Sequence, residues 1–261
     1  QNLVYRSESY PRPVVVVETS LLASSAVPSS IDAQLTFGGI SGSTVSYSTT
    51  GLAAGDPLRF ALQVDASSLS TGYYDYSFTL TAWISGSSYS RSYTGSQAVV
   101  NRSSSEFGGG WWLDGLDKLV VNSSGGLLVQ GNGDTLWFSS NGAGGYNKAV
   151  GDADYSALVK NANNTYTLTA KNGVARNFST TGLLTSVVDL NGNTTTLTYT
   201  DADSDTVVDE LSKITDPFSR DINLSYSSGR LSSITDFASR GTSLAYTSTR
   251  LTSATLPDPD G

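Results

Sequence analysis

The sequence of 261 residues contains no cysteine and no histidine. Without cysteine the chain cannot form disulfides or bind metals through thiolates. Without histidine it lacks the commonest general base and the commonest nitrogen ligand for metals. A serine nucleophile would need a lysine or a carboxylate as its base, and the sequence does not identify such a pair. We therefore predict that the protein is not an enzyme.

Basic residues and long apolar runs are also scarce. The chain has 15 Lys and Arg against 23 Asp and Glu, a formal net charge of −8. Because nucleic-acid binding needs a basic surface that displaces counterions from phosphates, we expect no nucleic-acid partner. There is no run of 18 apolar residues and no basic and apolar leader. We expect no membrane span, and a secreted protein would begin at Gln1 after processing.

The residues that are abundant favour β-structure. Valine, tyrosine and threonine recur in short runs between clusters of glycine, proline, aspartate and serine, which predicts an all-β fold of strands and turns. The clearest strand is 73–84, where Tyr76 and Phe78 alternate with Asp75 and Ser77. The other strands predicted in this half are 14–19, 31–37, 44–48, 58–65, 88–93 and 97–101.

These strands have the spacing of a β-sandwich domain, which we place at residues 13–100. Within it Leu69, Gly72 and Tyr74 resemble the tyrosine corner of immunoglobulin-like and fibronectin-like sandwiches, in which a tyrosine hydroxyl bonds to nearby backbone. The resemblance implies such a sandwich, preceded by an N-terminal extension at residues 1–12.

A second region opens with the segment Phe107-Gly-Gly-Gly-Trp-Trp112. Glycines permit a close turn of the backbone, so we predict that large rings from this segment plug a core. The alternative is a platform on which sugar rings stack. The candidate residues for that role are Trp83, Trp111, Trp112 and Trp137.

Hairpins follow this segment. Asn-Gly is a strong short-range signal for a hairpin turn, and it occurs at Asn132-Gly133 and Asn172-Gly173. The strands predicted to flank these turns are 127–130 with 135–138, and 165–170 with 174–178.

The C-terminal part contains a repeat. Leucines recur every 20 residues at Leu211, Leu231 and Leu251, after an earlier copy at Leu184. The copies that begin at Leu184, Leu211 and Leu231 each consist of a strand, a turn that begins with aspartate, and a strand that ends in Leu-x-Tyr. Their aspartates are Asp189, Asp216 and Asp236, and their tyrosines are Tyr199, Tyr226 and Tyr246. Stacked hairpins of this kind share one continuous sheet. We predict that the aspartates accept hydrogen bonds from turn amides and have no catalytic role.

Residues 101–261 resemble the YD-repeat, or Rhs-repeat, proteins of bacterial surfaces and toxins. The resemblance rests on Gly-Arg-Leu-x-Ser-Ile-Thr-Asp at residues 229–236, on the Leu-x-Tyr strand ends and on the glycine-tryptophan segment. It implies a spiralling sheet of hairpins, which in some members closes into a shell around a toxin and in others serves adhesion. About three and a half clear copies are too few to close a shell.

An acidic insertion interrupts the repeat after Tyr199. It carries Asp201, Asp203, Asp205 and Asp209, whose spacing matches positions one, three, five and nine of a calcium loop. The loop lacks the glycine at position six and the glutamate at position twelve. The two interpretations are a structural calcium site with these four ligands and a solvated acidic turn.

The run Val14, Val15, Val16 and Val17 predicts a strong strand. In one interpretation it is the first strand of its own sandwich. In the other it adds to the sheet of a second copy, and such head-to-tail contacts generate fibres.

We therefore predict a non-enzymatic, extracellular or cell-surface structural protein, with itself as partner in a filament joined by strand addition. The alternatives are a carbohydrate-binding or adhesive module with glycan partners, and a fragment of a larger Rhs toxin shell.

Overall fold

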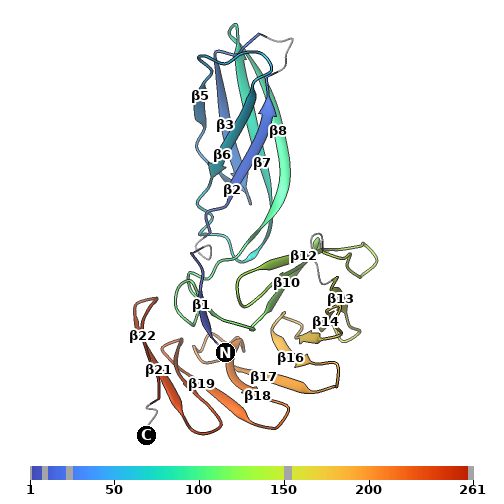
Figure 1. Ribbon diagram of the computed structural model, residues 1–261, viewed down its shortest axis with the longest axis vertical. Helices are drawn as coiled ribbons and strands as arrows, with labels where there is room; N and C mark the ends of the chain where they lie inside the picture. The colour runs from blue at the N-terminus through green and yellow to red at the C-terminus, as the bar shows by residue number, and fades with distance from the viewer. Residues whose placement is uncertain (1, 8–10, 22–25, 150–154, 258–261) are drawn as a thin grey trace. The chain divides into compact units, whose positions relative to one another are not determined.

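The computed structural model describes residues 2–7, 11–21, 26–149 and 155–257, and its regular elements are the strands β1 to β22 in antiparallel sheets (Figure 1). The predicted all-β class is thus confirmed. Across the described residues, no helix has the length and apolar character to cross a membrane. The chain forms two compact units, one of Tyr10–Asn101 and one of Gln1–Ser9 with Arg102–Gly261. Each unit is described by itself below.

The unit of Tyr10–Asn101 contains two sheets around one core. β2 pairs with β6, and the other sheet has the order β4-β3-β7-β8, with β5 also paired to β3. Val17 and Phe60 from the first sheet share the core with Leu35 and Phe78 from the second. The strands are β2 (Val14–Ser20), β3 (Ser30–Phe37), β4 (Ile40–Ser41), β5 (Val45–Ser48), β6 (Pro57–Gln63), β7 (Gly72–Ile84) and β8 (Ser87–Val99).

β7 has the predicted alternation. Phe78 and Leu80 are buried, and Tyr76 packs against the same core from the same face. Near the start of this strand the Tyr74 hydroxyl donates a hydrogen bond of 2.9 Å to the carbonyl oxygen of Ser70. This is the backbone contact expected of a tyrosine corner.

β8 corrects the prediction of two strands at 88–93 and 97–101. It is a single strand of 13 residues that pairs with β7 along its whole length. Gly95, which is between the two predicted strands, lies opposite Tyr76, and a Cβ at Gly95 would come within 2.5 Å of the Tyr76 hydroxyl oxygen. The glycine is there because an aromatic ring approaches the backbone closely, and no turn is needed.

The N-terminal residues correct the prediction of an extension at 1–12. β1 (Leu3–Tyr5) pairs with β9 (Trp111–Leu113), so the first residues are part of the unit that contains the repeats. Leu3 packs against the core of that unit, and the Tyr5 and Trp111 rings lie 5.5 Å apart. The strand has only three residues, and three residues are too few for a strand pattern to be recognised in the sequence.

In the repeat-containing unit β10 to β12 form a three-stranded sheet, and β13 to β22 form a ten-stranded sheet in sequence order. Both predicted Asn-Gly hairpins are present, as β11 with β12 and β14 with β15. The strands are β10 (Lys118–Asn122), β11 (Gly125–Val129), β12 (Thr135–Ser139), β13 (Ala157–Lys160), β14 (Tyr166–Thr169), β15 (Ala175–Phe178), β16 (Leu184–Val188), β17 (Thr194–Thr200), β18 (Glu210–Thr215), β19 (Asp221–Ser227), β20 (Arg230–Thr235), β21 (Gly241–Thr247) and β22 (Arg250–Thr255).

The turns that begin with aspartate, here called outer turns, are closed by their own side chains. Asp216 Oδ1 accepts the amides of Phe218 at 2.8 Å and Arg220 at 2.9 Å, while Oδ2 pairs with the Arg220 guanidinium at 2.6 Å. Asp236 makes the same set of bonds with Ala238 and Arg240. The predicted turn chemistry is confirmed, and each outer turn is specified by five consecutive residues.

The opposite ends of the repeat strands, here called inner ends, are held by the repeat leucines and tyrosines. The Tyr199 hydroxyl donates to the carbonyl oxygen of Leu184 at 2.8 Å, and the Tyr226 hydroxyl donates to that of Leu211 at 2.9 Å. Each tyrosine follows its leucine by 15 residues, and the strand register shifts immediately before it. A β-bulge therefore turns each ring toward the inner end of the preceding strand.

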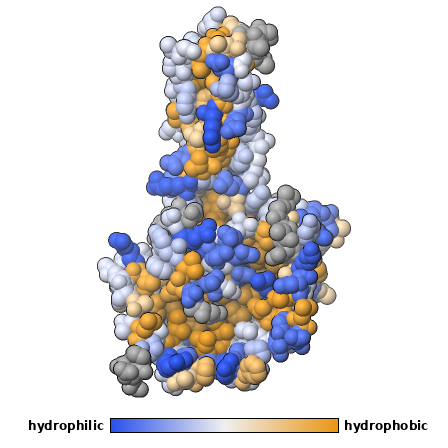
Figure 2. All heavy atoms as spheres, viewed as in Figure 1, coloured by the Kyte–Doolittle hydropathy of each residue, from blue (hydrophilic) through white to orange (hydrophobic). Residues whose placement is uncertain are grey.

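A glycine-rich plug segment, residues 102–113, packs against the inner ends. Phe107 is fully buried, and the Gly109 amide donates to the carbonyl oxygen of Thr249 at 2.7 Å. Gly108 has a φ of +105°, and a Cβ there would come within 3.2 Å of the backbone nitrogen of Leu251. In Figure 2 apolar residues gather in the middle of this unit, with hydrophilic residues along its margin. The segment and the hairpins share one core.

The tyrosine contacts predict unequal effects of two otherwise identical substitutions. Tyr226→Phe removes the donor to Leu211, and we expect it to lower the free energy of unfolding by about 1–2 kcal/mol. Tyr246→Phe is the matched control, because the buried Tyr246 hydroxyl has no hydrogen-bond partner among the described residues. We expect it to be neutral or stabilising. Urea unfolding measures both, and equal losses would contradict this account.

Candidate functional site

The acidic insertion lies at an inner end, where it connects β17 to β18. Its carboxylates accept backbone amides of the loop itself: Asp201 accepts those of Ser204 at 2.8 Å and Thr206 at 3.1 Å. At the far end of the loop Glu210 is buried and accepts the amide of Ala202 at 2.8 Å. The loop therefore folds back on its own side chains.

The carboxylates that come together differ from the predicted set. Asp201 and Asp203 converge with Glu210, with carboxylate oxygens of all three within 4.8 Å of one another. Asp205 and Asp209, the other two predicted ligands, are outside this group. Asp205 accepts the amide of Val207 at 2.7 Å, so its side chain supports a tight turn. The predicted ligand set, based on the spacing of a calcium loop, did not include Glu210. This residue begins β18, and its side chain points back across the insertion.

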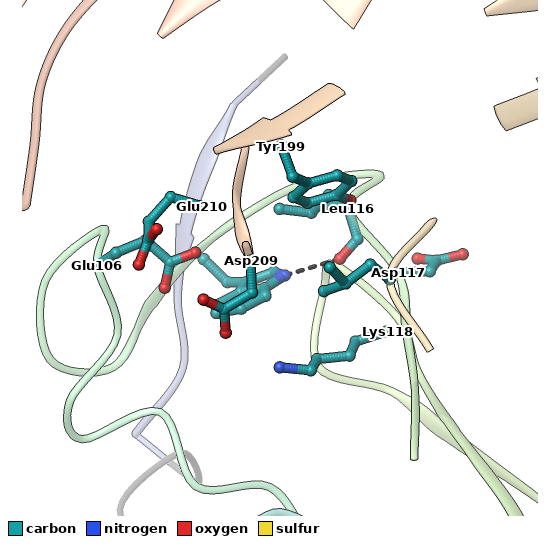
Figure 3. Close-up of a pocket in the computed structure, with 9 residues that line it drawn as sticks. Glu106, Leu116, Asp117, Lys118, Tyr199, Asp209 and Glu210 are labelled. Atoms are coloured by element: carbon teal, nitrogen blue, oxygen red, sulfur yellow. Dashed lines mark hydrogen bonds between the residues drawn. The ribbon is translucent and has the colours of Figure 1, made fainter. Parts of the chain in front are cut away.

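A small cavity lies beside the loop (Figure 3). It has a volume of about 60 Å³, and its lining comes from the plug segment, the start of β10, β17 and the insertion. Asp209 faces this cavity together with Glu106, Glu210 and Lys118. With Asp117, which also lines it, the cavity combines four carboxyl groups with one ammonium group and apolar walls from Leu116 and Trp112, among others.

Burial controls the ionisation of these acids. It raises the pKa of Glu106 to about 7, although the nearby Lys118 acts in the opposite direction. The pKa values of Asp209 and Glu210 are also raised, first by burial and then by neighbouring carboxylates. A carboxylic acid with a pKa near neutrality can exchange protons at physiological pH.

The cavity is nevertheless too small for an organic substrate. A volume near 60 Å³ is well below the roughly 300–1,000 Å³ of typical small-molecule sites. The Tyr199 hydroxyl, which lines the cavity, already donates to a backbone carbonyl. A cavity of this size has room for water molecules or a small cation.

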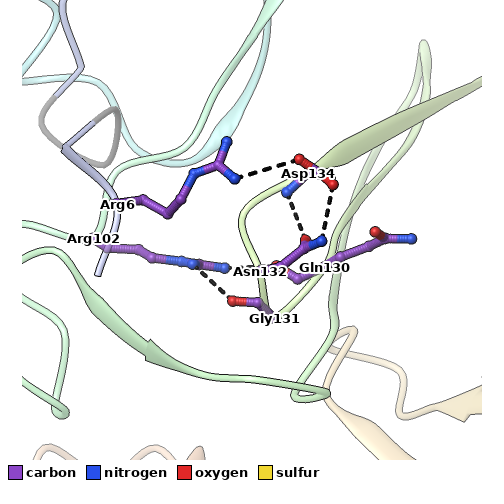
Figure 4. A network of polar contacts seen from close by, with 6 residues as sticks. All are labelled: Arg6, Arg102, Gln130, Gly131, Asn132 and Asp134. Atoms are coloured by element: carbon purple, nitrogen blue, oxygen red, sulfur yellow. Dashed lines mark hydrogen bonds and ion pairs between the residues drawn. The ribbon is translucent and has the colours of Figure 1, made fainter. Parts of the chain in front are cut away.

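A buried arginine holds the plug segment in place (Figure 4). The Arg102 guanidinium donates to the carbonyl oxygens of Gly131 at 3.1 Å and Gln130 at 2.8 Å, and it lies 4.8 Å from the centre of the Trp112 ring. Burial lowers its pKa to about 10. Nearby Arg6 pairs with Asp134 at 3.6 Å. Sequence analysis did not identify Arg102, because its partners are backbone atoms of a distant turn.

The tryptophans proposed as a sugar platform are divided between the two units. Trp111 and Trp112 are partly buried and pack against the core of the repeat-containing unit, and Trp137 is partly buried on β12. Trp83 belongs to the other unit, is 39% exposed, and donates from Nε1 to Asp32 at 2.8 Å.

The valine run pairs within its own chain. β2 lies against β6, with Val14 opposite Gln63. Val15 and Val17 are buried in the core and are not available to a partner, which corrects their place in the predicted interface. Val14 and Val16 are 49% and 43% exposed on the outer face, as the alternation of a strand requires.

Compared with known proteins, the chain matches no family model and no curated protein. The resemblance to YD-repeat proteins therefore depends on the residues quoted above.

Calcium binding by the insertion stays a prediction, now with a different ligand set. We expect calcium at about 100 times its Kd to raise the free energy of unfolding by about 2.7 kcal/mol, since binding to the folded state alone stabilises it. Asp203→Asn should abolish the effect, whereas Asp205→Asn, outside the converging group, should preserve it. Urea unfolding in calcium and in chelator measures the effect. No effect of calcium, or the same loss in both variants, would contradict the site.

Proposed function

We propose that the chain is a non-enzymatic structural module of an extracellular or cell-surface protein, and that it is extended by β-strand addition. The immunoglobulin-like character of the first unit and the YD-repeat character of the second are part of this proposal. The tyrosine-corner hydrogen bond supports the first, and the Asp-initiated turns with bulged tyrosines support the second.

The observation that carries the proposal is the open edge of β22. This strand pairs with β21 on one side and has no partner strand on the other among the described residues. Its residues from Thr252 to Thr255 are exposed and include no charge and no proline to prevent pairing. The preceding hairpins add to one another in a constant register, so a further hairpin or a strand from another copy can continue the sheet.

Strand addition serves two of the predicted functions. A second copy that pairs at this edge gives a fibre, whereas further repeats of a longer protein give the wall of a shell. Within the described ranges β2 pairs with β6 alone, so its other edge offers a second place for pairing between copies; Val14 and Val16 on this strand are exposed.

The test places lysines at the edge. Ser253→Lys with Thr255→Lys puts two charges on β22, and the matched control is Ala245→Lys with Ser243→Lys. The control positions are exposed and lie directly opposite on β21, one strand away from the edge. We expect the unmodified protein to form assemblies that grow with concentration, the edge variant to stay monomeric and the control to assemble.

Sedimentation velocity and negative-stain electron microscopy measure assembly. An unmodified protein that is monomeric at every concentration, or equal behaviour of the two variants, would refute strand addition at β22. Substitutions are preferable to removal of residues 1–19, because Val15 and Val17 belong to the core and their loss would unfold the first unit.

A further inference from the structure

Large apolar side chains are exposed at three successive outer turns. Leu190 and Phe237 directly follow the aspartates of their turns, and Phe218 lies one residue further on in the turn between them. The exposed fractions of Leu190, Phe218 and Phe237 are 74%, 80% and 57%. Single exposed apolar residues are common on protein surfaces, whereas neighbouring ones mark an interaction site.

The sheet topology places these three turns along one margin of the unit. Because β13 to β22 pair in sequence order, successive turns alternate between the two ends of the strands. The turns between β16 and β17, between β18 and β19, and between β20 and β21 therefore share one end, and they follow one another along the lower margin in Figure 1. Neighbouring outer turns are two strand spacings apart, roughly 9–10 Å, so the side chains form a row about 20 Å long.

Arg220 links two of these turns. Its guanidinium carbon lies 5.5 Å from the centre of the Phe218 ring and 4.9 Å from that of the Phe237 ring. The same guanidinium pairs with Asp216 at 2.6 Å, and the turn that contains Phe237 has an equivalent Arg–Asp pair. The charges beside the two rings are thus balanced within each turn, which leaves the rings as the main feature of this surface.

The form of the row suits a fluid apolar phase better than a folded protein. Its side chains project from the tips of separate turns, and a folded partner would need a hollow for each tip at the same spacing. The interfacial region of a bilayer accommodates separate tips without preformed hollows, and apolar side chains with polar neighbours are stable at that depth. Phe218, at the middle turn, is also the most exposed of the three.

We propose that the outer turns dock on the surface of a zwitterionic lipid bilayer. Phe218 enters the interfacial region deepest, Leu190 and Phe237 flank it, and Arg220 lies at the level of the lipid phosphates. The protein carries a net charge of −8, so anionic lipids repel it and zwitterionic lipids are preferred. This contact is peripheral and needs no segment that spans the bilayer. It goes beyond strand addition, because the turn tips make it and the edge of β22 does not.

A fluorescent label locates the contact. The chain contains no cysteine, so one introduced cysteine gives a single site for an environment-sensitive dye. Ala238→Cys places the dye at an outer turn, and Thr249→Cys places it at the inner return between β21 and β22; both positions are exposed. With phosphatidylcholine vesicles we expect the emission of the dye at position 238 to move to shorter wavelengths and that at position 249 to stay unchanged.

Vesicle flotation measures the strength of binding. Phe218→Ser should weaken binding to phosphatidylcholine vesicles about tenfold or more, because the buried ring accounts for a large part of the apolar contact. Tyr89→Ser is the matched control, since it removes a ring that is 62% exposed in the other unit, and it should leave binding unchanged. Vesicles that contain phosphatidylglycerol should bind more weakly at low ionic strength, and free phosphocholine should not compete.

Several results would overturn the proposal: no flotation with phosphatidylcholine vesicles, equal losses in Phe218→Ser and Tyr89→Ser, tighter binding to the anionic vesicles, or a dye shift at both positions. Displacement by free phosphocholine would indicate a headgroup site in place of bilayer docking. Loss of self-assembly in Phe218→Ser without vesicle binding would assign the row to contacts between copies. The lysine variants of β22 should float like the unmodified protein, so a failure of strand addition leaves this test intact.

Discussion

The structure of the repeat-containing unit depends on contact between the plug segment and the inner ends of the hairpins. A single antiparallel sheet cannot bury its apolar face alone, because nothing covers it. Phe107, fully buried, supplies that cover, and the carbonyl oxygen of Glu106 accepts the amide of Leu231 at 3.0 Å. The plug segment, which precedes the hairpins in sequence, thus covers their apolar face and completes a packed core.

This arrangement gives the two ends of each hairpin different freedom to change. Outer turns are fixed by one aspartate and its local partners, so they are nearly alike in every copy. The plug segment and the Leu–Tyr contacts hold the inner ends. The returns that connect the copies there differ in length, since the return between β17 and β18, at one of these inner ends, contains the acidic insertion. Repetition supplies the scaffold, and departures from it supply the candidate sites.

Local patterns predicted the local structure well. The period-two alternation at 73–84, the Asn-Gly turns and the Asp-initiated turns each depend on neighbouring residues, and the structure contains them. Features that depend on distant partners were missed. β1 is a strand because β9 lies beside it, and Glu210 joins Asp201 through a fold of the loop. The two strands predicted at 88–93 and 97–101 are one, and Gly95 between them makes room for the Tyr76 ring of another strand, β7.

The central claim is that the plug segment and the hairpins form one cooperative unit, and native-state hydrogen exchange tests it most directly. The Gly109 amide bonds to Thr249 and the Leu231 amide bonds to Glu106, so both report on the contact. We predict that these amides exchange with the same opening free energy as the amides of β19 and the remaining amides of β20, Ser232 to Thr235. Fast exchange at Gly109 and Leu231 while those strands stay protected would contradict the claim.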